Sequence, residues 1–245
     1  MGKIDFGVKS TERQAIGRGW TFGIVAGNSN SQFVNRQIKS IRAQGISEYE
    51  ILVVSPQKPE DEAVKWVPFS EKLHTNWITR KKNLLAQNAC HENLVLMHDY
   101  IGLEKDWAAG FEIFGNSWNI VLTRIEDISG RRFYDWVSWD SPIYPKYAPI
   151  PYSKKDHTSF QFIPGAYWVA KTEFMLANPL DESLSWGESE DVEWSLRVRD
   201  KGLVFNPYSK VRHLKRHRGF KFSRSINNDG LQICPRPDFL NWEQI

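Results

Sequence analysis

The chain has 245 residues, of which 41% are hydrophobic and 25% are charged, and its formal net charge is +3. These proportions are those of an ordinary globular protein, and no apolar run is long enough to span a membrane. The net charge is too small to indicate a nucleic-acid partner by itself. The only two cysteines, Cys90 and Cys234, are far apart in the sequence. This favours a reducing cytosol and argues against a metal–thiolate site.

The length favours one large α/β domain over two small ones. Residues 1–18 are polar and charged without an apolar stretch, so we expect a flexible N-terminal tail and no signal peptide. The domain is expected over residues 19–225, followed by a C-terminal extension at 226–245. We expect a cytoplasmic protein, and peripheral attachment to a membrane surface stays open.

Strands and helices alternate through the first half of the chain. Apolar runs predict strands at 20–26, 50–55, 63–67, 93–97 and 119–125. Apolar residues at helical spacing predict helices at 31–43, 77–89 and 106–114. This order indicates an α/β fold in which a mostly parallel central sheet is flanked by helices.

Regularity is lost between residues 126 and 163, a segment rich in Pro, Tyr, Ser and Trp. Irregular segments of this length are usually active-site loops or lids. Regular elements then resume, with strands predicted at 165–170, 203–206 and 210–214 and helices at 172–177 and 190–201. Trp168 lies in one of these apolar strands and is expected in the core.

Four carboxylates lie within six positions, from Glu188 to Glu193, where the last predicted helix begins. The unpaired N–H groups of a first helical turn favour negative charge. With Trp186 and Gly187 just ahead, such a cluster can supply a general base beside an aromatic wall. A well-capped helix with a solvated acidic start explains the same pattern, and core packing explains Trp186, so both alternatives stay open.

Polar residues follow the predicted parallel strands, where ligands of open α/β sheets bind. Asn28 and Ser55 end two strands, and His98 and Asp99 end a third. A carboxylate there can hold Mg²⁺ or Mn²⁺ against phosphate oxygens, and His213 could complete the ligand set. A turn-forming role for Asp99 and an ordinary structural role for His213 remain alternatives.

The chain becomes locally basic near its end. Between residues 210 and 224 there are seven Lys or Arg residues and no acid. We expect a basic patch there, because like charges this dense need an anionic partner or solvent.

Five segments occur in an order and spacing that resemble the GT-A-fold glycosyltransferases, in particular the inverting family-2-like enzymes. They are I-V-A-G-N at 24–28, T-R-K-K-N-L-L at 79–85, L-V-L-M-H-D-Y at 94–100, P-G-A-Y-W-V-A at 164–170 and W-G-E-S-E-D-V-E at 186–193. The resemblance covers residues 21–214. It implies a single Rossmann-like GT-A domain that uses a nucleoside-diphosphate sugar.

The resemblance also implies roles for individual residues. Donor binding falls on Ala26, Asn28, Ser55, Lys82, Asn83, His98, Asp99, Gly165 and Ala166. Mn²⁺ or Mg²⁺ would bind at Asp99 and His213. At this point the sequence departs from the family's Asp-x-Asp motif, because His98 and Tyr100 replace the two outer acids.

The same resemblance makes Asp191 the catalytic base, with Glu190 as the second candidate. Trp186 and Glu188 would contact the acceptor. Guanidinium and ammonium groups suit phosphate, so the expected phosphate contacts are Arg212, Lys215, Arg216 and Arg218. Asp99 and Asp191 are expected on opposite sides of one sugar-sized hollow.

We therefore expect an inverting glycosyltransferase that acts on a glycan, a lipid-linked sugar or another hydroxyl acceptor. One alternative is a nucleotidyltransferase, although residues 27–31 lack the cations expected in its phosphate loop. Another is a non-enzymatic module that binds nucleic acid or anionic lipid through residues 213–224. Nucleic acid is the less expected partner.

Overall fold

The computed structural model describes residues 17–72, 74, 76–138, 148–153 and 161–215. Most of the predicted N-terminal tail, and the whole predicted C-terminal extension at 226–245, lie outside these residues. The first strand, β1, spans Gly17–Val25, so the last two residues of the predicted tail belong to the sheet. No helix in the described part of the chain is long and apolar enough to cross a bilayer.

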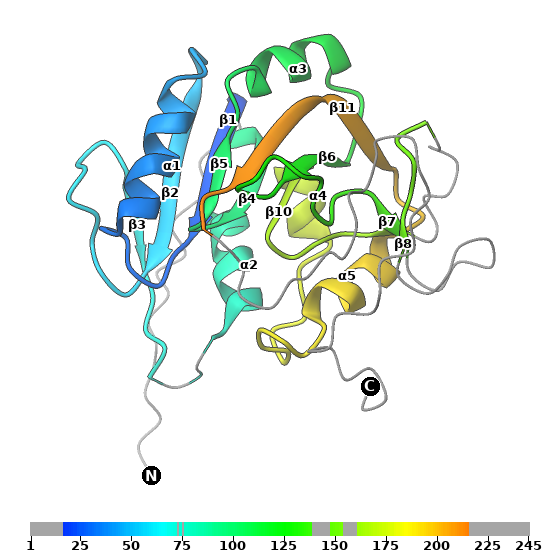
Figure 1. The fold of residues 1–245 in the computed structure, drawn as a ribbon. Coiled ribbons are helices and arrows are strands. Elements are labelled where there is room, and N and C mark those ends of the chain that lie inside the picture. The colour runs from blue at the N-terminus through cyan, green and yellow to red at the C-terminus, as the bar shows by residue number, and fades with distance from the viewer. Residues whose placement is uncertain (1–16, 73, 75, 139–147, 154–160, 216–245) are drawn as a thin grey trace.

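One eight-stranded sheet forms the centre of the molecule, in the order β3-β2-β1-β4-β10-β6-β11-β5 (Figure 1). β3, β2, β1 and β4 are parallel, as are β6 and β11, whereas β10 and β5 run antiparallel to their neighbours. The predicted mostly parallel sheet is confirmed. Beyond β1, its strands are β2 (Tyr49–Ser55), β3 (Lys65–Pro68), β4 (His91–His98), β5 (Ile101–Leu103), β6 (Ile120–Glu126), β10 (Tyr167–Lys171) and β11 (Leu203–His213).

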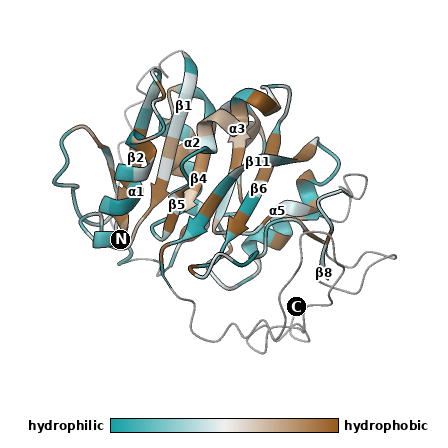
Figure 2. Ribbon diagram, turned by 45° about the horizontal axis from the view of Figure 1, so that its top comes forward, coloured by the Kyte–Doolittle hydropathy of each residue, from teal (hydrophilic) through white to brown (hydrophobic). Residues whose placement is uncertain are grey.

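Helices cover both faces of the sheet. Side chains of α1 and α3 join one buried cluster, and side chains of α2 and α4 join the other, whereas α5 contributes Val192 to the first and Trp194 and Val198 to the second. Successive residues in the middle of the central strands alternate between the two clusters, which is why these strands carry apolar residues on both faces there (Figure 2). The helices are α1 (Gln32–Arg42), α2 (Ile78–Asn88), α3 (Trp107–Phe114), α4 (Thr172–Ala177) and α5 (Glu190–Val198).

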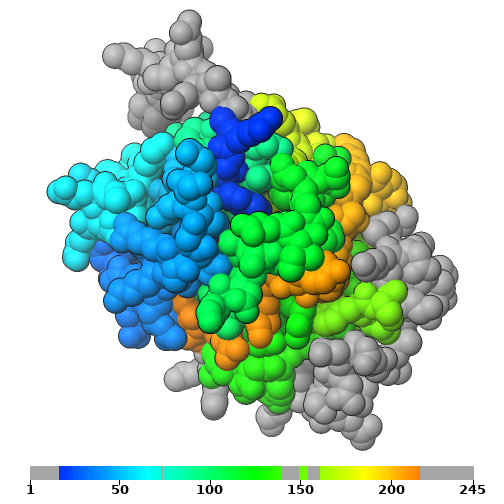
Figure 3. Space-filling view, turned by 90° about the horizontal axis from the view of Figure 1, so that it is seen from above, coloured from blue at the N-terminus to red at the C-terminus, as the bar shows by residue number. Residues whose placement is uncertain are grey.

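Two glycines let helices approach the sheet closely. A Cβ on Gly110 of α3 would lie 2.6 Å from the Tyr208 carbonyl oxygen, and α3 packs directly on β11 (Figure 3). A Cβ on Gly23 of β1 would lie 3.0 Å from a methyl carbon of Leu85 in α2. Larger side chains at either position would push a helix away from the strands it covers.

The predicted irregular region contains a small second sheet. Three two-residue strands pair in the order β8-β7-β9, with β7 at Val137–Ser138, β8 at Ala148–Pro149 and β9 at Gln161–Phe162. A buried ion pair between Arg132 and Asp135, at 2.7 Å, stabilises the segment beside it. Strands this short show no periodicity in the sequence, so they could not be predicted.

Two predicted boundaries were wrong. The two short strands expected at 203–206 and 210–214 form one strand, β11, whose register shifts between Asn206 and Lys210 around Pro207. Proline has no N–H to donate to the hydrogen bonds between strands, so the register shift lets β11 continue past Pro207. The last helix, α5, ends at Val198, three residues before its predicted end at 201.

Candidate functional site

The carboxyl edge of the sheet brings the ends of β1 and β4 against the start of β10. The Asp99 amide donates to the Val25 carbonyl at 3.1 Å, and the His98 amide donates to the Ala166 carbonyl at 2.9 Å. Because β10 is antiparallel to β4, its first residues lie beside the last residues of β4. Strand pairing therefore gathers residues from three predicted motifs at one edge.

Gly165 connects the predicted base to a buried lysine. Its N–H donates to Asp191 Oδ2 at 2.9 Å, and its carbonyl accepts from Lys82 Nζ at 2.8 Å. A Cβ at Gly165 would lie 2.9 Å from Asp191 Oδ2, so only glycine lets the carboxylate approach this closely. The small residue predicted here on other grounds is needed because the backbone contacts Asp191.

The environment of Asp191 raises the proton affinity of its carboxylate above that of a carboxylate in water. Burial, followed by the nearby Glu190 carboxylate, raises the pKa of Asp191 to about 6, whereas Lys82 and the N–H groups of Gly165 and Val192 oppose this rise. Glu190 is itself only 5% exposed. A carboxylate whose pKa lies near neutral pH is suited to take a proton from a hydroxyl.

The charges of three acidic residues act on Tyr100. Burial chiefly raises the pKa of its phenol, and the charges of Asp99, Asp191 and Glu190 raise it further. Asp99 and Asp191 therefore both act electrostatically on this one phenol. Tyr100 entered the sequence-based prediction only as a departure from the Asp-x-Asp motif, and no pattern in the sequence pointed to this environment.

His98 is held as a neutral imidazole. Burial lowers the pKa of His98 well below its usual value, and the cations of Lys82 and Lys215 lower it further. Its Nδ1 lies 3.1 Å from the Tyr100 hydroxyl, and its carbonyl accepts from Gln37 at 2.9 Å. Among the described residues, its buried Nε2 has no hydrogen-bond partner. No pattern in the sequence pointed to Gln37.

Of the two predicted metal ligands, Asp99 suits a cation and His213 is buried among aromatic rings. Asp99 offers one carboxylate at the edge, which suits the mode in which Mg²⁺ or Mn²⁺ binds one protein carboxylate and substrate phosphates. His213 is buried, with its ring 4.2 Å from that of Phe133 and 5.4 Å from that of Tyr100. Within the described residues, His98, Asp99 and His213 do not form a three-ligand group.

The predicted donor-binding residues of β1 and β2 also end at this edge. Ala26 is buried, with its amide on the Val54 carbonyl, and Asn28 is exposed. The Ser55 hydroxyl donates to the Gln57 carbonyl at 2.6 Å. Because β1 and β2 are parallel neighbours, their terminal loops lie side by side and border the same region as Asp99.

Asn83 has a different environment from that of Lys82. Its amide donates to the Leu180 carbonyl and to Glu182, each at 2.9 Å, and its carbonyl accepts from the Leu180 amide. Thr79 donates to the Leu184 carbonyl at 2.7 Å. The structure therefore uses Asn83 to fasten the segment ahead of α5 to α2, and does not bring its side chain to Asp191.

The segment between this fastening and α5 presents Trp186 to solvent. Trp186 is 63% exposed, so its alternative role in the core is excluded, whereas Trp168 is buried as predicted. Glu188 accepts from the Ser185 amide at 2.6 Å, which closes the turn. Ser189 has a φ of 62° and immediately precedes α5. Trp186 and Glu188 thus border the start of the helix that carries Asp191.

The expected phosphate contacts separate into two groups. Arg212 pairs with Glu104 at 2.6 Å and with Glu126 at 3.2 Å, so its guanidinium is already neutralised. Lys215 instead places its ammonium 4.0 Å from the centre of the Tyr100 ring, within the candidate site. Arg216 and Arg218 lie outside the described residues.

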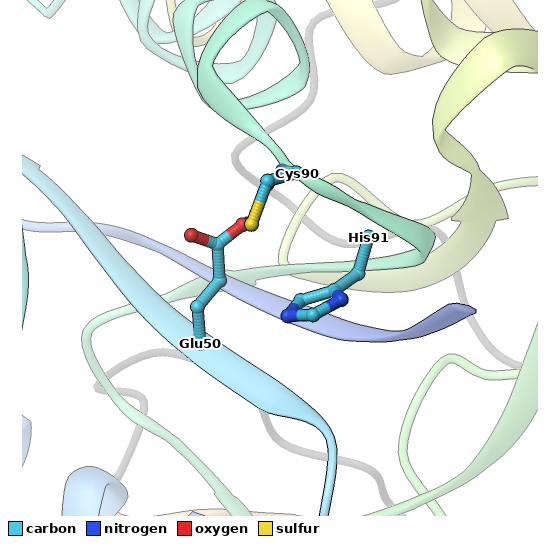
Figure 4. Close-up of side chains that lie close together, drawn as sticks. All are labelled: Glu50, Cys90 and His91. Atoms are coloured by element: carbon cyan, nitrogen blue, oxygen red, sulfur yellow. Dashed lines mark hydrogen bonds between the residues drawn. The ribbon is translucent and has the colours of Figure 1, made fainter. Parts of the chain in front are cut away.

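The opposite, amino edge of the sheet carries a second polar group, which we call the amino-edge cluster: Glu50, Cys90 and His91 (Figure 4). One ligand atom from each lies within 4.8 Å of the others. The Lys65 ammonium contacts the Glu50 carboxylate at 2.6 Å, so a cation already occupies this position. No sequence pattern predicted this cluster, because Glu50 is 40 residues from Cys90.

No protein-family model and no curated protein sequence matches the chain. Solved structures do match its fold. The crystal structure of GalNAc-T7 with UDP, GalNAc and Mn²⁺ has a TM-score of 0.61 and 18% identity, covering 82% of this chain and 44% of that one. Residues 1–349 of S. aureus TarS in complex with UDP-GlcNAc have a TM-score of 0.52 and 14% identity, covering 81% and 59%.

TarS 1–349 with UDP gives a similar match, with a TM-score of 0.53 and 14% identity over 79% of this chain and 60% of that chain. Together with the strand order described above, these matches show that the chain has the GT-A fold found in glycosyltransferases. The predicted fold is confirmed. The chain spans about half the length of these solved proteins.

Proposed function

We propose that this protein is an inverting glycosyltransferase that moves a sugar from a nucleoside-diphosphate sugar to an acceptor hydroxyl. The observation that carries the proposal is the Asp191 carboxylate, whose raised pKa and position at the carboxyl edge of a GT-A sheet suit a general base. GalNAc-T7 and TarS, whose folds are similar, were crystallised with UDP or UDP-GlcNAc. A uridine diphosphate sugar is therefore the first donor to test.

The proposed chemistry is one displacement. An acceptor hydroxyl is too weak an acid to ionise at neutral pH, so Asp191 accepts its proton as the oxygen attacks the anomeric carbon. The bond from that carbon to the diphosphate breaks, and the diphosphate leaves with the electron pair. Attack opposite the leaving group inverts the anomeric carbon. The hydrogen bonds from Gly165 and Val192 leave lone pairs on the carboxylate for the incoming hydroxyl.

Charge on the leaving diphosphate needs a counter-charge at the same edge. Lys215, close to Tyr100, supplies one cation directly. A Mn²⁺ or Mg²⁺ ion held by Asp99 and the phosphate oxygens would supply further neutralisation when bound. The ends of β1 and β2, with Asn28 and Ser55, are proposed to receive the nucleoside, because they border Asp99.

The acceptor is proposed to approach from the side of α5. Trp186 offers an exposed aromatic face on which a sugar ring can stack, and Glu188 stands two residues away. Glu190, next to Asp191, is placed to accept a second acceptor hydroxyl or to act as the base instead.

A donor panel tests this function. Purified protein is incubated with UDP- and GDP-sugars and mixed acceptors, with Mn²⁺, with Mg²⁺ and with a chelator, while nucleoside diphosphate release is measured. We expect release with at least one donor and loss of release in Asp191→Asn, with donor affinity retained. Nucleotide release equal to wild type in Asp191→Asn contradicts the base assignment. Absence of donor binding by calorimetry across the panel contradicts the function.

A further inference from the structure

Lys82 is a buried cation whose ammonium contacts a backbone carbonyl and an aromatic ring. Its side chain comes from α2 and is only 1% exposed. Its ammonium donates to the Gly165 carbonyl and lies 4.5 Å from the centre of the Trp168 ring. In the described part of the chain it forms no ion pair. Burying a charge on a carbonyl and an aromatic face costs free energy that a neutral side chain of similar size would avoid.

The two hydrogen bonds of Gly165 link this lysine mechanically to the base. Lys82 holds the carbonyl of the residue whose N–H holds Asp191 Oδ2, and the two distances are 2.8 and 2.9 Å. Asp191 also occupies the space beside Gly165 into which a Cβ would project, so no side chain fits there. Any movement of this backbone therefore moves the carboxylate or breaks its hydrogen bond.

Lys82 also acts on Asp191 through charge. The groups that influence the carboxylate are Glu190 on the same helix, Lys82 on α2, the N–H groups of Gly165 and Val192, and the Tyr100 phenol after β4. Of these side chains, Lys82 is the one that lowers the pKa of Asp191. Burial lowers the pKa of Lys82 itself, and the charges of Glu190 and Asp191 oppose that change.

We propose that Lys82 is a positioning residue for the transfer reaction, which fixes the Asp191 carboxylate through the peptide units of Gly165 and keeps it ionised at neutral pH. The proposal rests on the function proposed above. It differs from the donor contact that the resemblance implied for this residue. In the structure the ammonium faces the protein backbone and the Trp168 ring.

The test compares Lys82→Met with Lys81→Met. Lys81 is the adjacent lysine of the same helix and is also buried, but it pairs with Glu71 and lies over the Phe69 ring. The midpoint of the Asp191 carboxyl titration is measured by ¹³C NMR and assigned with Asp191→Asn. We expect the midpoint to rise by about one pH unit in Lys82→Met and to stay unchanged in Lys81→Met.

Catalysis gives the second readout. At pH 6.5 we expect kcat of Lys82→Met to be reduced about tenfold, about threefold of it from the smaller ionised fraction of Asp191 and the rest from displacement of the carboxylate, with partial recovery towards pH 8.5 and an acidic limb displaced by about one pH unit. Lys82→Arg retains a charge and is expected to keep the wild-type titration midpoint. If Lys82→Met lacks a cooperative unfolding transition, Lys82→Gln takes its place.

The two proposals fail separately. An unchanged Asp191 midpoint in folded Lys82→Met, in a protein that transfers sugar, overturns the role of Lys82 alone. A displaced midpoint in a protein that neither binds nor turns over any sugar nucleotide supports the coupling of Lys82 to Asp191 and overturns the glycosyltransferase. A pH profile that moves equally in Lys81→Met also overturns the role of Lys82, because it shows a general effect of removing charge from α2.

Discussion

The two edges of the central sheet use similar residue types in opposite ways. At the amino edge, the Glu50 carboxylate accepts hydrogen bonds from Thr21, the Cys90 amide and Lys65, which together lower the pKa of Glu50 against the effect of burial. At the carboxyl edge, burial and a second carboxylate raise the pKa of Asp191. One carboxylate is stabilised as an anion, and the other is held close to protonation.

This difference separates a structural polar group from one suited to accept a proton. A buried carboxylate with three donors contributes to folding and has little tendency to take a proton. A buried carboxylate beside another acid destabilises the folded state but is ready to accept a proton. At the same edge as Asp191, the buried Nε2 of His98 has no hydrogen-bond partner among the residues that the structure describes, which strengthens the contrast. The edges can therefore be distinguished by mutations that separate stability from catalysis.

The largest expected effect comes from Asp191→Asn. We expect kcat to fall by about 10³-fold, the range of general-base catalysis, while donor affinity measured by calorimetry stays within about threefold. The free energy of unfolding, in contrast, is expected to rise in this variant. The raised pKa of Asp191 means that the folded protein binds more protons than the unfolded chain between about pH 4 and pH 6, so ionisation of this group destabilises the fold above pH 6.

Asp191→Asn is accordingly expected to raise the free energy of unfolding at pH 7 by about 1–2 kcal/mol and to leave it unchanged at pH 4. Denaturant titration at the two pH values checks this. A variant that loses activity and is also less stable at pH 7 would show that Asp191 is a structural carboxylate like Glu50.

The second effect is expected from Gly165→Ala. The new Cβ would lie 2.9 Å from Asp191 Oδ2, so the carboxylate must move. We expect kcat to fall by about 10²-fold, because displacement of a reacting group by about 1 Å has this effect. Gly17→Ala, at the amino edge, is the matched control, since its Cβ would meet no atom closer than 3.8 Å. Steady-state kinetics of both variants decides, and equal activities contradict the assigned contact.

The third effect is on stability alone. Glu50→Gln keeps the size of the side chain but weakens its hydrogen bonds and leaves Lys65 unpaired, so we expect a loss of about 2 kcal/mol at pH 7. Because the pKa of Glu50 is lowered, its stabilisation is present above its unfolded pKa and is lost as the pH falls through the folded value. The difference from wild type should therefore shrink below pH 4. A kcat changed more than twofold contradicts the structural role.

The smallest effect is expected from Lys65→Met. The Lys65 side chain is 58% exposed, and ion pairs at such positions contribute at most about 1 kcal/mol. Thermal unfolding should shift by a few degrees at most, and by less in 1 M salt than in 0.05 M salt. A salt-independent loss would show that Lys65 acts by packing and not by charge.

Much of the fold could be predicted because its signals are local. The apolar strands and amphipathic helices carry periodicity, and parallel strand order places the residues after β1, β2 and β4 at one edge. The link from Lys82 to Gly165 could not be predicted, because it spans 83 positions and involves a backbone carbonyl. Arg212 was assigned from its charge, whereas its acidic partners, Glu104 and Glu126, are 108 and 86 positions away in the sequence.

The route of the chain between β6 and β10 has a consequence for substitutions near Asp191. These strands are antiparallel neighbours, so β6 ends and β10 begins at the same edge of the sheet. The described part of the connection between them contains the small sheet, and its side chains Phe133, Trp136 and Ile163 belong to the two clusters of the main core. Its strand β9 also packs on α5, the helix that carries Asp191, and the Ile163 amide donates to the Ser195 hydroxyl at 2.9 Å. Replacements in this connection are therefore expected to disturb both the core and the position of Asp191.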